Sequence, residues 1–180
     1  MTDSWEKDAL AVDNYNIVEA QRGREFIIRL TTGADVFFAI QKFAKDKNLR
    51  FAKIHTAFMG GLQPARLDIW VPDTQDAANW HRERTLEVQN LSMVLSMSGI
   101  IHPRPLKGGG EELFPAIHCV IGGGWDVPTA GGHMMEGTIV KGVLEVFVTE
   151  ILGIDVLFPS SIILDPSSDE APENWYQEVR

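Results

Sequence analysis

The chain has 180 residues, 44% of them hydrophobic, which is enough for one domain with a substantial core. Its formal net charge is -9, so a nucleic-acid backbone is repelled overall unless arginines and lysines gather on one face. Composition and charge therefore disfavour direct DNA binding.

The single cysteine, Cys119, excludes an internal disulfide and any metal site built from several thiolates. The N-terminal sequence has neither a basic start nor an apolar run, and no stretch approaches the roughly 20 apolar residues of a membrane span. We therefore expect a soluble, cytoplasmic protein that does not enter a membrane.

Three parts are predicted along the chain: an N-terminal arm over 1–23, one domain over 24–164 and an acidic C-terminal tail over 165–180. The arm is polar with sparse apolar positions, and the tail is acidic and contains proline. Inside the domain, a polar insertion is predicted over 73–84. Regular structure is thus expected in the central domain.

One amphipathic helix is predicted in this domain. Over 31–48 the apolar spacing becomes helical, with apolar side chains at Val36, Phe37, Ile40, Phe43 and Ala44. Asp35 or a preceding threonine can cap the first turn.

The rest of the domain is predicted to form strands. Strand-like runs separated by glycine or proline cover 24–30, 50–61, 65–71, 85–101, 114–121, 138–151 and 154–159. One helix among strands joined by tight turns indicates an α+β domain with a mostly antiparallel sheet. The glycine triplets at 108–110 and 122–124 lack the following helix and Lys-Ser/Thr pair of a phosphate loop.

Residues 114–137 form the most distinctive stretch, FPAIHCVIGGGWDVPTAGGHMMEG. Successive side chains of a strand point to opposite faces, so His118 shares a face with Ala116 whereas Cys119 lies on the other. We therefore expect Cys119 to be a core residue rather than a nucleophile paired with His118.

The same stretch carries candidate metal ligands. If the glycine-rich segment joins neighbouring elements, His118 and His133 meet across it and Glu136 follows closely. Two imidazoles suit a transition metal such as zinc, with Glu136 as a general base, but a catalytic zinc usually has three protein ligands. Candidates for the third are the remaining histidines, His55, His81 and His102. Alternatively, His118 is a buried histidine bonded to backbone and the Gly-Gly-His sequence forms a turn.

Four segments carry a family resemblance: AFMGGLQPARLDIW (57–70), SMVLSMSG (92–99), AIHCVIG (116–122) and GGHMMEGTIV (131–140). In this order, with the predicted helix before them, they resemble the plant- and prokaryote-conserved (PPC) domain family, also called DUF296. The likeness covers about residues 24–155, and the Gly-Gly-His block is its most specific part.

The resemblance implies an α+β fold, with a strongly curved, mostly antiparallel sheet packed with one main helix, and usually a homotrimer. In plants the domain accompanies a separate basic AT-hook that enters the DNA minor groove. Here Arg22, Gly23 and Arg24 lack the proline and basic flanks of such a hook. The chain is similar to a prokaryotic member without an AT-hook, for which DNA contact would need a partner.

Several prokaryotic members have a histidine cluster thought to hold a metal. His118 and His133 match two positions of that cluster, whereas Ala116 stands at the position of another histidine. Met93 stands where many members carry a glutamate. Because residues 116 and 118 share a face, the alanine removes a ligand from the side where a metal would lie.

These features are compatible with three functions. The first is an oligomeric PPC-type domain, DNA-associated or regulatory, which acts by binding a protein partner or a small ligand. The second is a metal-dependent enzyme that uses His118 and His133 as ligands and Glu136 as a base on a small polar substrate. The third, direct DNA binding, rests on family labels alone.

Overall fold

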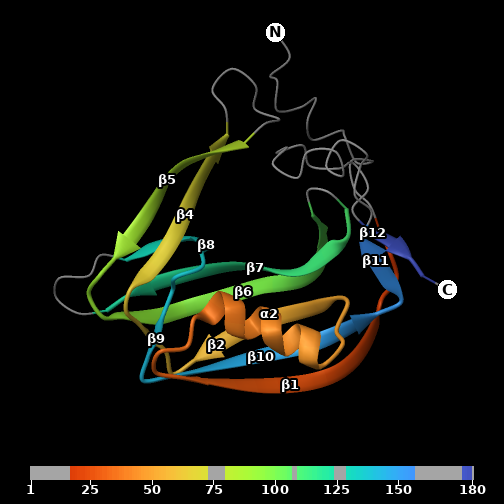
Figure 1. The fold of residues 1–180 in the computed structure, drawn as a ribbon, viewed down its shortest axis with the longest axis horizontal. Coiled ribbons are helices and arrows are strands. Elements are labelled where there is room, and N and C mark those ends of the chain that lie inside the picture. The colour runs from red at the N-terminus through yellow and green to blue at the C-terminus, as the bar shows by residue number, and fades with distance from the viewer. Residues whose placement is uncertain (1–16, 73–79, 107–108, 124–128, 157–175, 180) are drawn as a thin grey trace, which may run out of the picture.

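The computed structural model describes residues 17–72, 80–106, 109–123, 129–156 and 176–179 (Figure 1). Most of the predicted arm and tail lies outside these residues. The elements in chain order are β1 (Gln21–Thr31), α2 (Val36–Asp46), β2 (Ala52–Phe58), β3 (Gly61–Leu62), β4 (Ala65–Pro72), β5 (Trp80–Val88), β6 (Ser92–Pro105), β7 (Glu111–Gly122), β8 (Ala130–Met134), β9 (Val140–Lys141), β10 (Val143–Leu152), β11 (Ile154–Val156) and β12 (Tyr176–Glu178).

Ten strands form one sheet, whose main path runs β1-β10-β2-β6-β7-β8-β4-β5, while β3 and β9 pair beside it and β11 pairs with β12. Its strand pairs are antiparallel. Figure 1 shows the sheet bending, with the β4–β5 hairpin rising away from β6 and β7. The predicted α+β class, with a curved antiparallel sheet and a single helix in the described part, is confirmed.

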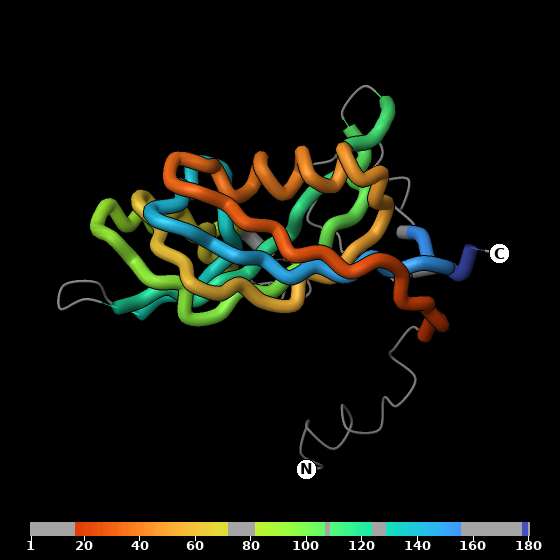
Figure 2. The backbone as a smooth tube through the Cα atoms, turned by 90° about the horizontal axis from the view of Figure 1, so that it is seen from below, coloured from red at the N-terminus to blue at the C-terminus, as the bar shows by residue number. Residues whose placement is uncertain are grey.

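The helix forms where the sequence predicts it. Asp35 is the N-cap, and its side chain accepts a hydrogen bond from the Phe38 backbone N–H at 3.2 Å. Val36, Ile40 and Ala44 follow at four-residue spacing and are fully buried. A cap of this kind stabilises a helix by about 1 kcal/mol. Figure 2 shows α2 lying on one side of β1, β10 and β2.

The sheet therefore has two different faces. The inner face packs against α2 and carries the core, to which β7 contributes Ile117, Cys119 and Ile121. The opposite, outer face carries the alternate β7 residues, among them Ala116 and His118, and near the start of β7 it also meets α2 through Phe114 and Glu112. Burial raises the pKa of the Cys119 thiol to about 12, as expected for a packed core cysteine.

Two sequence expectations about β5 and β6 are wrong. The run predicted as one strand over 85–101 is divided, because β5 ends at Val88 and β6 begins at Ser92. The polar insertion predicted over 73–84 contains the start of β5, while 73–79 lie outside the described residues. Polar residues suit β5 because it ends the sheet path and its side chains over 82–85 are exposed.

No helix in the described part of the chain is long and apolar enough to cross a membrane.

Candidate functional site

His118 and His133 lie side by side on the outer face. They are direct partners in the antiparallel pairing of β7 with β8. Their ring centroids are 5.3 Å apart, and the rings meet edge to face at 80°. His118 is exposed and His133 is half-buried. The alternative of a buried His118 is therefore wrong.

The Gly-Gly-His sequence is strand rather than turn, which corrects the other half of that alternative. Gly131, Gly132 and His133 belong to β8, which lies between β7 and β4. A Cβ atom at Gly132 would come within 2.7 Å of the Asp68 carbonyl oxygen. The missing side chain thus allows β8 to fit closely against β4, which brings His133 level with Asp68.

A row of directly paired residues crosses five strands of the outer face. From β6 to β5, this polar row consists of Ser98, His118, His133, Asp68 and Thr85. Directly opposed residues of an antiparallel sheet have Cβ atoms about 5 Å apart on the same face. The row is therefore a continuous line of hydrogen-bonding side chains with the two imidazoles at its centre.

Asp68 is the buried carboxylate of the polar row, with 2% of its surface exposed. Its Oδ1 accepts a hydrogen bond from the Thr85 hydroxyl at 2.6 Å, and its Oδ2 accepts one from Arg82 Nη1 at 3.3 Å. A buried carboxylate needs such partners, because an unpaired charge is expensive away from water. Asp68 is thus held in place beside His133 by the β5 strand.

Aromatic side chains border the histidine pair. The Phe114 ring lies parallel to the His133 ring, with centroids 6.1 Å apart, and meets the Phe37 ring of α2 at 5.5 Å. It also lies 5.8 Å from the ring of His102. The guanidinium carbon of Arg104 lies 3.9 Å from the Phe114 centroid, a cation–π contact.

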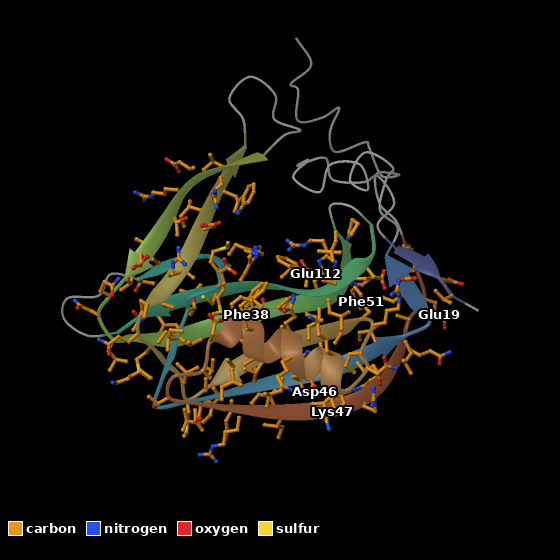
Figure 3. The ribbon with its side chains drawn as sticks, viewed as in Figure 1. Glu19, Phe38, Asp46, Lys47, Phe51 and Glu112 are labelled. Carbon is orange, nitrogen blue, oxygen red and sulfur yellow. The ribbon has the colours of Figure 1, made fainter. Side chains whose placement is uncertain are left out.

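The Arg104 side chain is paired with the carboxylate of Glu112. Arg104 Nε donates to Glu112 Oε1 at 3.2 Å, and Nη2 donates to the same oxygen. Glu112, labelled in Figure 3, also accepts a hydrogen bond from Gln41 of α2. The charge of Arg104 is therefore largely balanced, so the site gains little net positive charge from it.

Burial and nearby positive charges lower the pKa values of two histidines, His133 and His102. Burial, then His118 and Arg104, lower the pKa of His133 below its usual 6.5, while the Asp68 carboxylate opposes this. Burial also lowers the pKa of His102, whose Nδ1–H donates to the Pro103 carbonyl at 2.8 Å. The lowered pKa favours the neutral form of the His133 imidazole, which has one hydrogen-bond donor and one acceptor.

The other predicted site residues lie elsewhere. Glu136 is exposed in the turn between β8 and β9, where its carbonyl accepts a hydrogen bond from Arg66 at 3.0 Å. His55 on β2 bonds Thr149 through Nε2 at 2.6 Å. The side chain of His81 lies outside the described part of the chain.

A catalytic zinc site at the histidine pair would need a third protein ligand. Among the described residues, no group of three or more histidine, cysteine, aspartate or glutamate side chains could hold a metal ion. Two imidazoles alone do not fit a catalytic zinc site, which takes three protein ligands. Within the described part of the chain, the pair thus supplies two of the three protein ligands that a catalytic zinc usually has.

Sequence reasoning missed Asp68, Thr85, Phe114 and Arg104 as parts of this site. One signal was available, since Asp68 is a charged residue inside the apolar run ARLDIWV. Nothing in the sequence indicated that β4 lies beside β8, which is what brings Asp68 to His133.

Comparison with known proteins agrees with this fold. The model of the Plants and Prokaryotes Conserved (PCC) domain family matches residues 17–152. Since that is most of the chain, the protein belongs to this family, the one that its motifs resemble. No curated protein matches the chain significantly.

Solved structures share the fold at low sequence identity. A plant- and prokaryote-conserved protein from Pyrococcus horikoshii is 20% identical, with a TM-score of 0.64 over 92% of this chain and 99% of its own. A metal-containing protein from Archaeoglobus fulgidus is also 20% identical, with a TM-score of 0.63 over 92% and 100%. A protein from Bacteroides thetaiotaomicron that is named as a candidate DNA-binding protein is 16% identical. Its TM-score is 0.58 over 89% of this chain and 99% of its own.

Proposed function

We propose that this protein is a regulatory, ligand-binding domain without catalytic activity, and that a small ligand binds on the outer face around His118 and His133. The observation that carries the proposal is the polar row, which places two imidazoles between a buried carboxylate and a serine hydroxyl. Small-molecule sites combine a few fixed polar groups with apolar and aromatic neighbours, and the Phe114 ring lies beside His133 here.

We further propose that the domain works as a homotrimer and contacts a protein partner. The family resemblance suggests the trimer. Exposed apolar side chains on β2 and β6 support subunit or partner contact: Phe58 is 59% exposed, Met93 45% and Leu95 56%. Apolar surface of this kind favours association.

Direct DNA binding is less favoured than action through a ligand or a protein partner. The name of the Bacteroides protein suggests DNA, but the present chain has a net charge of -9 and no AT-hook sequence. We expect no salt-sensitive retention on duplex DNA, and strong retention at low salt that falls steeply with added salt would contradict this expectation.

Ligand binding can be tested with the intact protein. Native mass spectrometry of protein purified without an affinity tag should detect a bound small molecule, and His133→Ala should lose it. His55→Ala is the matched control, because His55 lies on β2 and bonds Thr149. Equal ligand retention in both variants would sink the proposed site.

A metal-dependent enzyme is the second candidate, because two imidazoles lie together and the Archaeoglobus fulgidus protein is named as metal-containing. Metal analysis of the same preparation tests it. Near one equivalent of a transition metal per chain, lost in His133→Ala, would favour the enzyme. Near zero, with no uptake of added zinc, would favour the ligand-binding domain.

A further inference from the structure

The two outermost strands of the sheet, β1 and β5, differ in what they expose. The sheet path begins with β1 and ends with β5, so each pairs with one neighbour in the described part of the chain. Such an edge strand presents backbone N–H and C=O groups that can pair with a further strand. β5 exposes consecutive charged side chains over 82–84, which oppose such pairing. On β1, by contrast, Ile27 is 67% exposed.

The edge formed by β1 is long and regular. The strand has 11 residues, and from Glu25 to Thr31 it pairs with β10 without a register shift. Figure 1 shows it along the lower margin of the sheet, and Figure 2 shows α2 lying to one side of it. Among the described residues, no strand pairs with its outer edge.

Three exposed residues alternate on the outer face of β1: Glu25, Ile27 and Arg29. Ile27 is directly opposite the half-buried Phe147 of β10, so the apolar surface continues onto the next strand. The side chain of Glu25 is 51% exposed and that of Arg29 62%. An isoleucine thus lies between two accessible charges of opposite sign.

Both charges have neighbours within the chain but retain capacity for another partner. Arg29 Nη1 lies 3.6 Å from Glu145 Oε1, which leaves further N–H donors on its guanidinium. Glu25 Oε1 accepts hydrogen bonds from Arg22 Nε and, at 2.8 Å, from the Thr149 hydroxyl. A carboxylate has about four acceptor positions, so Glu25 can accept a further hydrogen bond.

The sequence Glu-Phe-Ile-Ile-Arg over 25–29 is complementary to itself in antiparallel orientation. When two copies pair about Ile27, the two isoleucines face each other and Glu25 faces Arg29 in both directions. Apolar and opposite-charge pairs stabilise an antiparallel pairing, whereas like charges destabilise it. A pairing centred on Glu25 or Arg29 would oppose like charges. A centre at Phe26 or Ile28 would leave both charges opposite uncharged residues.

We propose that β1 pairs in antiparallel orientation with β1 of a second copy of this chain, with Ile27 at the two-fold axis. The same surface then serves both copies, and their two sheets become continuous. This contact goes beyond the proposed ligand-binding function and uses a different surface from the exposed side chains of β2 and β6. Together with the proposed homotrimer it gives an assembly of six chains.

Light scattering during size-exclusion chromatography of the full chain tests the contact. Ile27→Lys places two lysines directly opposite each other, so the mass of the assembly should fall by half. Phe38→Lys is the matched control, because Phe38 is 50% exposed on α2, and it should keep the mass of the natural chain. Thermal melting confirms that each variant is folded. An unchanged mass in Ile27→Lys would overturn the inference.

A disulfide tests the register. The single natural cysteine, Cys119, is buried, so oxidation reports an introduced thiol. Ile27→Cys should link two chains under mild oxidation, since paired Cα atoms lie about 5 Å apart. Glu25→Cys is the control, because its two cysteines would lie about 13 Å apart along the strands. Linkage of Glu25→Cys in place of Ile27→Cys would contradict the pairing.

The measured masses separate this inference from the proposed homotrimer. Six chains that become three in Ile27→Lys would support both. Two chains that become one would support the β1 contact and contradict the homotrimer. Three chains in both proteins, without the disulfide, would exclude the β1 contact and leave the homotrimer standing. One chain in both would exclude both contacts.

Discussion

The two faces of β7 show how one strand serves two purposes. Its inward residues Ile117, Cys119 and Ile121 are buried in the core against α2. Its outward residues include Phe114 and His118, which are half-buried or exposed and contact polar and aromatic neighbours. The inward residues maintain the fold, so the outward ones are free to vary in chemistry. Stability and binding should therefore respond to different substitutions on the same strand.

The largest expected effect comes from the inward face. Ile117→Ala should lower the free energy of unfolding by about 2–5 kcal/mol, because it removes fully buried methyl groups and leaves a cavity. His118→Ala, its neighbour on the exposed outward face, should change that free energy by about 0.5 kcal/mol or less. Urea unfolding measures both, and comparable losses would contradict the division of roles.

A smaller effect is expected at the buried end of the polar row. Asp68→Ala should destabilise the protein by about 1–3 kcal/mol, because the Thr85 hydroxyl and Arg82 lose their acceptor. Urea unfolding again provides the measurement, with Glu136→Ala as an exposed acidic control. An unchanged free energy of unfolding in Asp68→Ala would show that the hydrogen bonds of Asp68 do not stabilise the fold.

The smallest effects concern proton binding at the histidine pair. His133 should titrate below its usual pKa of 6.5 in a histidine NMR titration, because burial disfavours the charged ring and His118 and Arg104 repel it. Asp68→Asn should lower the pKa of His133 further, because the carboxylate raises it. His118→Ala should raise it, because a repelling imidazole is gone. A pKa that moves the opposite way in either variant would contradict the arrangement.

Local patterns predicted much of the fold correctly. The helix and its Asp35 cap follow from apolar spacing and a short polar residue before it, since both depend on neighbours within one turn. The core position of Cys119 follows from alternation along β7. The run over 85–101 was predicted as one strand because the gap between β5 and β6, residues 89–91, is short and contains no proline or glycine.

By itself, the sequence determined the single helix, the antiparallel strands, the family and the shared face of Ala116 and His118. These features depend on the periodic spacing of side chains and on motifs, which are local. The tertiary structure alone decided that Asp68 lies beside His133 and that Phe114 borders the pair. Those contacts join segments far apart in the chain, and they exist because β8 inserts between β7 and β4, an arrangement set by the packing of the whole sheet.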